Sequence, residues 1–244
     1  MEASYHMKPL VIAIDGPSGA GKGTVASQIA KILGYRHVDT GAMYRAIAWK
    51  ALKTEINLDD ENAVTQIAKR SRIFVLGGVV SIDDEDITTA IRTTAIDKAA
   101  AAIARLPQVR KILVNLQREF GHDGAVVMEG RDIGTVVFPA ADVKIYLDAS
   151  PEERARRRAS DQDHASGTAG QAAVAKAIEA RDRSDTTRTV SPLKIAPDAF
   201  HLDTTSMGIE AVVDRVMELI QKKLAIMWRK MKVTPEDCYL FDPF

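Results

Sequence analysis

The 244-residue sequence contains very little cysteine and carries no excess of charge. Its single cysteine, Cys238, excludes an intrachain disulfide and a metal cluster built from several cysteines, a pattern typical of a reducing compartment. Lys plus Arg and Asp plus Glu both number 33, so the formal net charge is zero. This balance argues against broad electrostatic binding to nucleic acid or to an anionic membrane, but it is compatible with a local basic pocket.

Long hydrophobic runs are also missing. The longest early apolar run, Leu10 to Ile14, is far too short to cross a bilayer, and no signal peptide is visible. We therefore expect a cytoplasmic protein that binds neither membrane nor nucleic acid. With 46% hydrophobic and 27% charged residues, the chain suits one large globular domain carrying smaller inserted parts. Residues 1–6 resemble an expression leftover, which makes Met7 the expected native start.

A glycine-rich stretch, IDGPSGAGKGT from Ile14 to Thr24, comes close to the phosphate-binding pattern G-x-x-x-x-G-K-[ST]. An apolar run precedes it, and helical periodicity follows it until Gly34. Strand, turn and helix together are the context in which backbone N–H groups and a lysine bind nucleotide phosphates. The predicted phosphate-binding residues are Gly16, Pro17, Ser18, Gly19, Ala20, Gly21, Lys22, Gly23 and Thr24.

Further apolar runs alternate with helical segments along the chain. The additional predicted strands are Arg36 to Gly41, Ala125 to Glu129, Val143 to Asp148 and Ala199 to Thr204. This alternation predicts an α/β fold, a P-loop three-layer α/β/α arrangement around a parallel sheet. Residues 7–61 and 107–224 would form that core, and a final helix starts near Met207.

Residues 62–106 break this rhythm. Two β-like arms around Gly77 and Gly78 indicate a hairpin, and the Ala-rich stretch Ala95 to Leu106 indicates a helix, so we expect an inserted subdomain. Residues 160–171 are small and polar, which is typical of a mobile loop. They lie inside a predicted lid at about residues 154–188.

Charged residues gather where the predicted strands end. The stretches are DTGAMYR (Asp39 to Arg45), PQVR (Pro107 to Arg110), EGRDIG (Glu129 to Gly134), RARRR (Arg154 to Arg158) and RDRSDTTR (Arg181 to Arg188). Ligands of open α/β sheets bind at the carboxyl ends of the strands, so these stretches can converge on one cleft. Arginines bind phosphates bidentately and stay charged, which suits phosphoryl transfer between two anions.

The run RARRR has more than one interpretation. Arg154, Arg157 and Arg158 fall on one helical face, and beside a mobile loop they predict a lid that closes over ATP. Taken alone, the run could also be a solvated basic face or a nucleic-acid patch. Zero net charge and the absence of an aromatic stacking stripe count against the nucleic-acid interpretation.

Together the motifs resemble bacterial cytidylate kinases from Met7 to about Leu224. The stretches that carry the resemblance are IDGPSGAGKGT, DTGAMYR, IRT (Ile91 to Thr93), EGRDIGTVVFPAADVKIYLDAS (Glu129 to Ser150) and RDRSDTTRTVSPL (Arg181 to Leu193). The resemblance implies a monomer that transfers the γ-phosphate of ATP to CMP or dCMP, with Mg²⁺. It also implies that residues 62–106 form the subdomain that encloses the nucleoside monophosphate.

Carried over by position, the resemblance implies a role for each charged residue. Arg45, Arg131 and Arg188 would hold the CMP phosphate, Arg110 and Asp132 would meet the cytosine, and Arg181 and Asp185 would meet the sugar. Thr40 joins the expected substrate-binding residues. The expected catalytic residues are Lys22, Arg131, Arg157, Arg158 and Arg188, of which Arg157 and Arg158 belong to the lid.

The metal has no firmly predicted direct ligand. The usual P-loop hydroxyl position is occupied by Gly23, and Thr24 points about 100° away on a helix. We therefore expect Mg²⁺ to be held by ATP oxygens and waters, with Glu129 or Asp132 ordering those waters and Thr24 bonding an inner phosphate.

Two departures from the family pattern bear on specificity and on the chain end. Ala101 stands where many members place a serine that contacts cytosine, so how strictly the protein would reject UMP is left open.

Residues 225–244 extend past the expected end of the family. We expect them to add core packing or to contact a partner, and Cys238 is interpreted as an incidental thiol.

Other functions remain open at this point. Another small P-loop kinase would act on UMP, AMP or a non-nucleotide acceptor. A nucleotide-binding switch would need no second phosphate clamp, so Arg45, Arg131 and Arg188 distinguish it from a kinase.

Overall fold

The computed structural model describes residues 9–160 and 171–231. The expected start at Met7, most of the expected mobile loop and Cys238 lie outside the described residues. Within them, no helix is long and apolar enough to cross a membrane.

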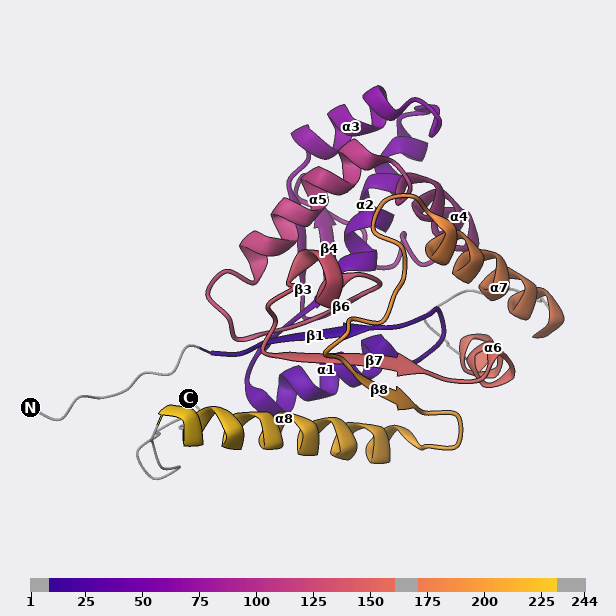
Figure 1. The fold of residues 1–244 in the computed structure, drawn as a ribbon. Helices are drawn as coiled ribbons and strands as arrows, with labels where there is room; N and C mark the ends of the chain where they lie inside the picture. The colour runs from indigo at the N-terminus through magenta and orange to yellow at the C-terminus, as the bar shows by residue number, and fades with distance from the viewer. Residues whose placement is uncertain (1–8, 161–170, 232–244) are drawn as a thin grey trace, which may run out of the picture.

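Five parallel strands form the central sheet (Figure 1). In spatial order they are β2 (Arg36–Asp39), β6 (Val126–Gly130), β1 (Val11–Asp15), β7 (Val143–Asp148) and β8 (Phe200–Asp203). All the strands in the sheet were predicted within about two residues, because buried parallel strands are continuous apolar runs. Their carboxyl ends lie at one edge of the sheet, where the glycine-rich turn and three of the five charged stretches begin, those at Asp39, Glu129 and Arg154.

Helices cover both faces of the sheet, as the three-layer prediction requires. Ile12 and Ile14 of β1 pack with α1 (Lys22–Leu33) and α8 (Ile209–Met231). The alternate residues Val11 and Ala13 pack on the other face, where α2 (Thr40–Lys53) and α5 (Pro107–Phe120) lie (Figure 1). The predicted parallel α/β fold is confirmed.

The segment between α2 and α5 holds the smaller elements. They are α3 (Glu61–Arg70), β3 (Ile73–Leu76), β4 (Val79–Ile82), β5 (Glu85–Asp86) and α4 (Thr94–Ile103). The three strands form an antiparallel sheet whose β3–β4 hairpin turns at Gly77 and Gly78, as predicted.

The remaining helices frame the carboxyl edge of the sheet. They are the π-helix η1 (Ile133–Val137) after β6, then α6 (Pro151–Ser160) after β7, and α7 (Gln171–Thr187), which packs on α6. Helix α8 continues without a break through residue 225 to Met231, so the predicted extension begins inside a helix rather than after one.

Candidate active site

The glycine-rich turn joins β1 to α1 with three glycines at positive φ, the first of which is Gly16 at φ +152°. Gly19 has φ +77° and Gly21, the N-cap of α1, has φ +87°. The buried Lys22 donates from Nζ to the Pro17 carbonyl oxygen at 2.7 Å, and Arg157 of α6 donates to the Ala20 carbonyl at 3.4 Å. Burial, followed by the charge of Arg131, lowers the pKa of Lys22 to about 7.

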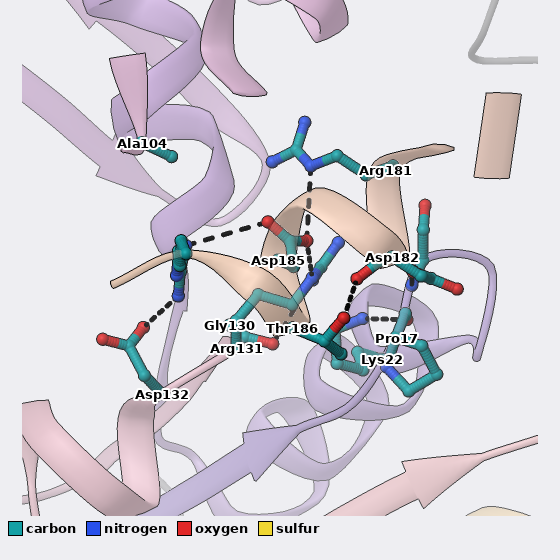
Figure 2. Close-up of polar contacts among 12 residues, drawn as sticks. Pro17, Lys22, Ala104, Gly130, Arg131, Asp132, Arg181, Asp182, Asp185 and Thr186 are labelled. Carbon is teal, nitrogen blue, oxygen red and sulfur yellow. Dashed lines mark hydrogen bonds and ion pairs between the residues drawn. The ribbon is translucent and has the colours of Figure 1, made fainter. Parts of the chain in front are cut away.

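The carboxylate of Asp185 on α7 lies close to three arginines. Asp185 accepts from Arg131 Nε at 2.9 Å and from Arg181 Nε at 3.3 Å, and Arg188 Nη1 lies 3.7 Å away. Figure 2 shows Asp185 between Arg131 and Arg181, with Lys22 nearby. Burial raises the pKa of Asp185, but the three arginines outweigh it and leave that pKa below its ordinary value.

The site also contains a buried ion pair, formed by Arg110 and Asp132. Arg110 donates to the Asp132 carboxylate, and both side chains are buried. Arg188 Nη2 lies 3.6 Å from Asp132 Oδ1. Among the described residues, the buried Arg110 Nε and Arg188 Nη2 have no hydrogen-bond partner, so this corner can satisfy further polar groups of a ligand.

Asp39 and Thr40, where β2 ends and α2 begins, connect further residues of the site. Asp39 caps α2 by accepting from Ala42 N at 3.1 Å, and it also pairs with Arg45. Thr40 Oγ1 donates to the Glu129 backbone carbonyl at 2.7 Å, which ties β2 to β6. The Glu129 carboxylate contacts His37 Nε2 at 3.1 Å and lies over Gly23, where an added Cβ would come within 3.0 Å of it.

Most of these groups border one cleft of about 1240 Å³. That volume exceeds the roughly 300–1,000 Å³ of a typical single-ligand pocket. Residues 18–24 line it, together with the predicted residues Thr40, Arg45, Arg110, Arg131, Asp132, Arg157, Arg158, Arg181 and Arg188. The predicted residues Asp185, Gly16 and Pro17 do not line the cleft, and the buried Asp185 pairs with three arginines that do.

The predicted lid arginines do not share one environment. Arg157 donates to the backbone carbonyl of Thr204 at 2.6 Å as well as to the P-loop, whereas Arg158 pairs with Asp97 of α4 at 2.6 Å. Arg154 contacts the P-loop backbone instead of the cleft.

Comparison with known proteins decides the family. A family model described as cytidylate kinase matches residues 12–222. The cytidylate kinase of Solibacter usitatus (strain Ellin6076) is 44% identical over 226 residues, covering 91% of this chain and 97% of the relative. That of Desulfitobacterium hafniense (strain Y51) is 48% identical over 220 residues, covering 89% and 95%. The chain belongs to the cytidylate kinase family.

Membership in the cytidylate kinase family confirms the predicted resemblance and the predicted enzyme class, an ATP-dependent phosphotransferase. Among solved structures, the shikimate kinase from Acinetobacter baumannii in complex with shikimate matches with a TM-score of 0.46 and 14% identity. The match covers 88% of this chain and 94% of the shikimate kinase. It is too distant to support a statement about the site.

Sequence reasoning missed several carboxylates of this cytidylate kinase family site. Asp15 ends β1 and accepts from the backbone N–H groups of Ile133 and Gly134 at 2.8 and 2.7 Å, which holds the start of η1. Burial raises the pKa of Asp15 to about 6. Its position at a strand end was a usable signal. Asp97 and Asp182 offered none, because their partners come from distant segments.

Proposed function

We propose that this protein transfers the γ-phosphate of ATP to CMP or dCMP, giving ADP and CDP or dCDP. One observation carries the proposal: a P-loop and a separate arginine cluster open into the same cleft. A switch protein needs only the first of these. Two phosphate-binding groups facing one space bring the two anions together, and that positioning is the main work of phosphoryl transfer.

On the donor side, the backbone N–H groups of the P-loop and the α1 N-terminus would hold the ATP phosphates. Lys22 is part of this loop, and its ammonium group would leave the Pro17 carbonyl to meet the outer phosphates. Its ammonium form would then neutralise the charge that grows on the oxygens between ADP and the transferred group. Arg157, which lies at the Ala20 carbonyl, would assist from α6.

On the acceptor side, Arg45, Arg131 and Arg188 would hold the monophosphate. Asp185 and Asp39 keep these guanidinium groups in place before the ligand arrives. An oxygen of the CMP phosphate then forms a bond to the γ-phosphorus while the bond to the ADP oxygen breaks. The arginines would oppose the repulsion between these two anions.

The sugar and the base would lie deeper. Arg181 would meet the sugar hydroxyls, held from behind by the buried Asp185, and the buried Arg110–Asp132 pair would meet the cytosine edge. Ala101 and Ala104 contribute apolar wall to the same cleft. Because Ala101 offers no hydroxyl, discrimination against uracil would rest on Arg110 and Asp132.

The donor set at the P-loop fits Mg²⁺ held through ATP oxygens and waters. The Glu129 carboxylate lies against Gly23, so it can order waters beside the phosphates. Both carboxylates are already in contact with a partner, Asp132 with Arg110 and Glu129 with His37, but Glu129 lies against Gly23 of the P-loop and is therefore the better candidate. The ion would supply charge neutralisation on the phosphate oxygens. Thr24 bonding an inner phosphate stays a prediction, as do the monomeric state and the cytoplasmic location.

A coupled assay of ATP consumption with CMP, dCMP, UMP and AMP tests the proposal. CMP and dCMP should stimulate turnover strongly, and AMP should stimulate it little. Stimulation by UMP measures how strict Arg110 and Asp132 are without a serine at position 101. If CMP has no effect while another monophosphate does, the protein is a different small P-loop kinase.

A further inference from the structure

The peptide groups around Ser18 in the P-loop are held by two charged side chains from the α6–α7 pair. Asp182 Oδ1 accepts from Ser18 N at 3.0 Å, and Arg154 Nη1 donates to Ser18 O at 3.0 Å. Arg154 also pairs with the second oxygen of Asp182, and its Nε donates to Ala149 O at 3.0 Å. The two side chains therefore form one unit around Ser18.

This unit is shielded from solvent. The side chain of Arg154 is 11% exposed and that of Asp182 is 16% exposed. The main chain of α6 also packs directly on the loop, because an added Cβ on Gly19 would come within 2.7 Å of Arg154 O. Charge-assisted hydrogen bonds in such a setting are stronger than those of exposed ion pairs, which are usually worth little.

Geometry links these contacts to phosphate binding. In a trans peptide the C=O and N–H groups point in opposite directions, and no cis peptide occurs among the described residues. Asp182 holds the Ser18 N–H of the first peptide unit, whose Pro17 carbonyl accepts from Lys22 until Lys22 turns to the phosphates. Arg154 holds the Ser18 carbonyl, which directs the Gly19 N–H the other way.

We propose that Arg154 and Asp182 are positioning residues for the donor nucleotide, because they fix the peptide orientations with which the P-loop meets the ATP phosphates. This inference rests on the proposed function, since it assumes that ATP is the donor. Neither residue has to touch a nucleotide. Their effect passes through the backbone of Ser18.

The two residues differ in how cleanly they can be tested. Asp182 lies on α7 beside Arg181, and its charge acts on both Lys22 and Arg131. Removing it could disturb the acceptor side directly. Arg154 lies on α6 and contacts the P-loop away from the cleft, so Arg154→Ala is the more selective variant.

The experiment measures KM for ATP and KM for CMP in Arg154→Ala, Asp182→Ala and the double variant. We expect KM for ATP to rise about tenfold to a hundredfold, the range that loss of a charge-assisted hydrogen bond gives, while KM for CMP stays within about twofold in Arg154→Ala. The double variant should be no worse than the poorer single variant, because the residues act as one unit. Arg183→Ala is the matched control, since Arg183 is exposed on α7 and pairs only locally with Glu179.

Binding of a non-hydrolysable ATP analogue, measured without CMP, gives a readout independent of turnover. Thermal unfolding of each variant shows whether the fold is kept, and Arg154→Ala decides alone if Asp182→Ala does not fold. An unchanged affinity for the analogue in Arg154→Ala overturns the inference, as does an equal rise in both KM values. Failure of the proposed function is distinguishable, because the unsubstituted protein would then show no CMP-stimulated turnover.

Discussion

The donor side and the acceptor side of the cleft are built in different ways. The P-loop is a continuous run of nine residues that would bind phosphates with its backbone, so its glycines matter more than its side chains. The acceptor side is assembled from side chains of separate segments, among them Arg45, Arg131 and Arg188. A single continuous motif identifies the first, whereas the fold must form before the second exists.

The two sides also handle charge differently. Lys22 is buried and forms no salt bridge with a carboxylate of the described residues, and burial lowers its pKa to about 7. The acceptor arginines are paired in advance with Asp39, Asp132 and Asp185. Partly or fully buried pairs of this kind cost desolvation energy but hold each group in one geometry, so the proposed acceptor clamp would exist before a monophosphate binds.

The largest expected effect comes from breaking the donor side with Lys22→Ala. Turnover should fall by about a thousandfold or more, because the charge that opposes the growing negative charge on the phosphate oxygens is lost. KM for CMP should change little, since the acceptor arginines and their carboxylates remain. Steady-state kinetics in the coupled assay, with circular dichroism to check the fold, measures this. Near-normal turnover would falsify a catalytic role for the P-loop.

A smaller effect, on the acceptor side of the cleft, is expected from Arg131→Ala. KM for CMP should rise about tenfold to a hundredfold, because a charge-assisted contact to the monophosphate is lost. Affinity for an ATP analogue should stay within a few-fold, because Arg181 and Arg188 still neutralise Asp185.

Two measurements check the Arg131 prediction. Isothermal titration with each nucleotide separates the acceptor affinity from the donor affinity. The exposed residue Arg215, which pairs locally with Glu218 on α8, provides the matched control in Arg215→Ala. Equal loss of both affinities would show that Arg131 serves the whole cleft and not the acceptor alone.

Much of the fold was predictable because it rests on local patterns. The strands of the parallel sheet are continuous apolar runs, and the helix after the P-loop shows its periodicity and its stop at Gly34, which has φ +64°. The hairpin at Gly77 and Gly78 was equally local. Helix α8 runs without a break past residue 225 to Met231, so the point where the family resemblance ended is not the end of a helix.

The site was predictable only in part. The arginines could be placed at strand ends, but their partners could not, because a salt bridge depends on which distant segments the fold brings together. Arg154 is the clearest case: it shares a helical face with Arg157 and Arg158, yet its partner is a carboxylate 28 residues away that belongs to α7. These contacts support the positioning role at the P-loop that we propose for Arg154.

The smallest expected effect is a pH dependence that separates the donor side of the cleft from the acceptor side. With a pKa lowered to about 7, Lys22 in the free protein loses its proton as the pH rises through 7, so kcat/KM for ATP should fall above that pH. At saturating ATP the nearby phosphates favour the ammonium form, so kcat should hold to higher pH. The acceptor arginines do not titrate in this range, so kcat/KM for CMP at saturating ATP should also stay level.

Rate profiles measured from pH 7 to 9 avoid the ionisation of the nucleotide phosphate, whose pKa is about 6. In Lys22→Arg the fall should disappear even where the overall rate is lower, because a guanidinium keeps its charge; the same fall in that variant would assign it to another group.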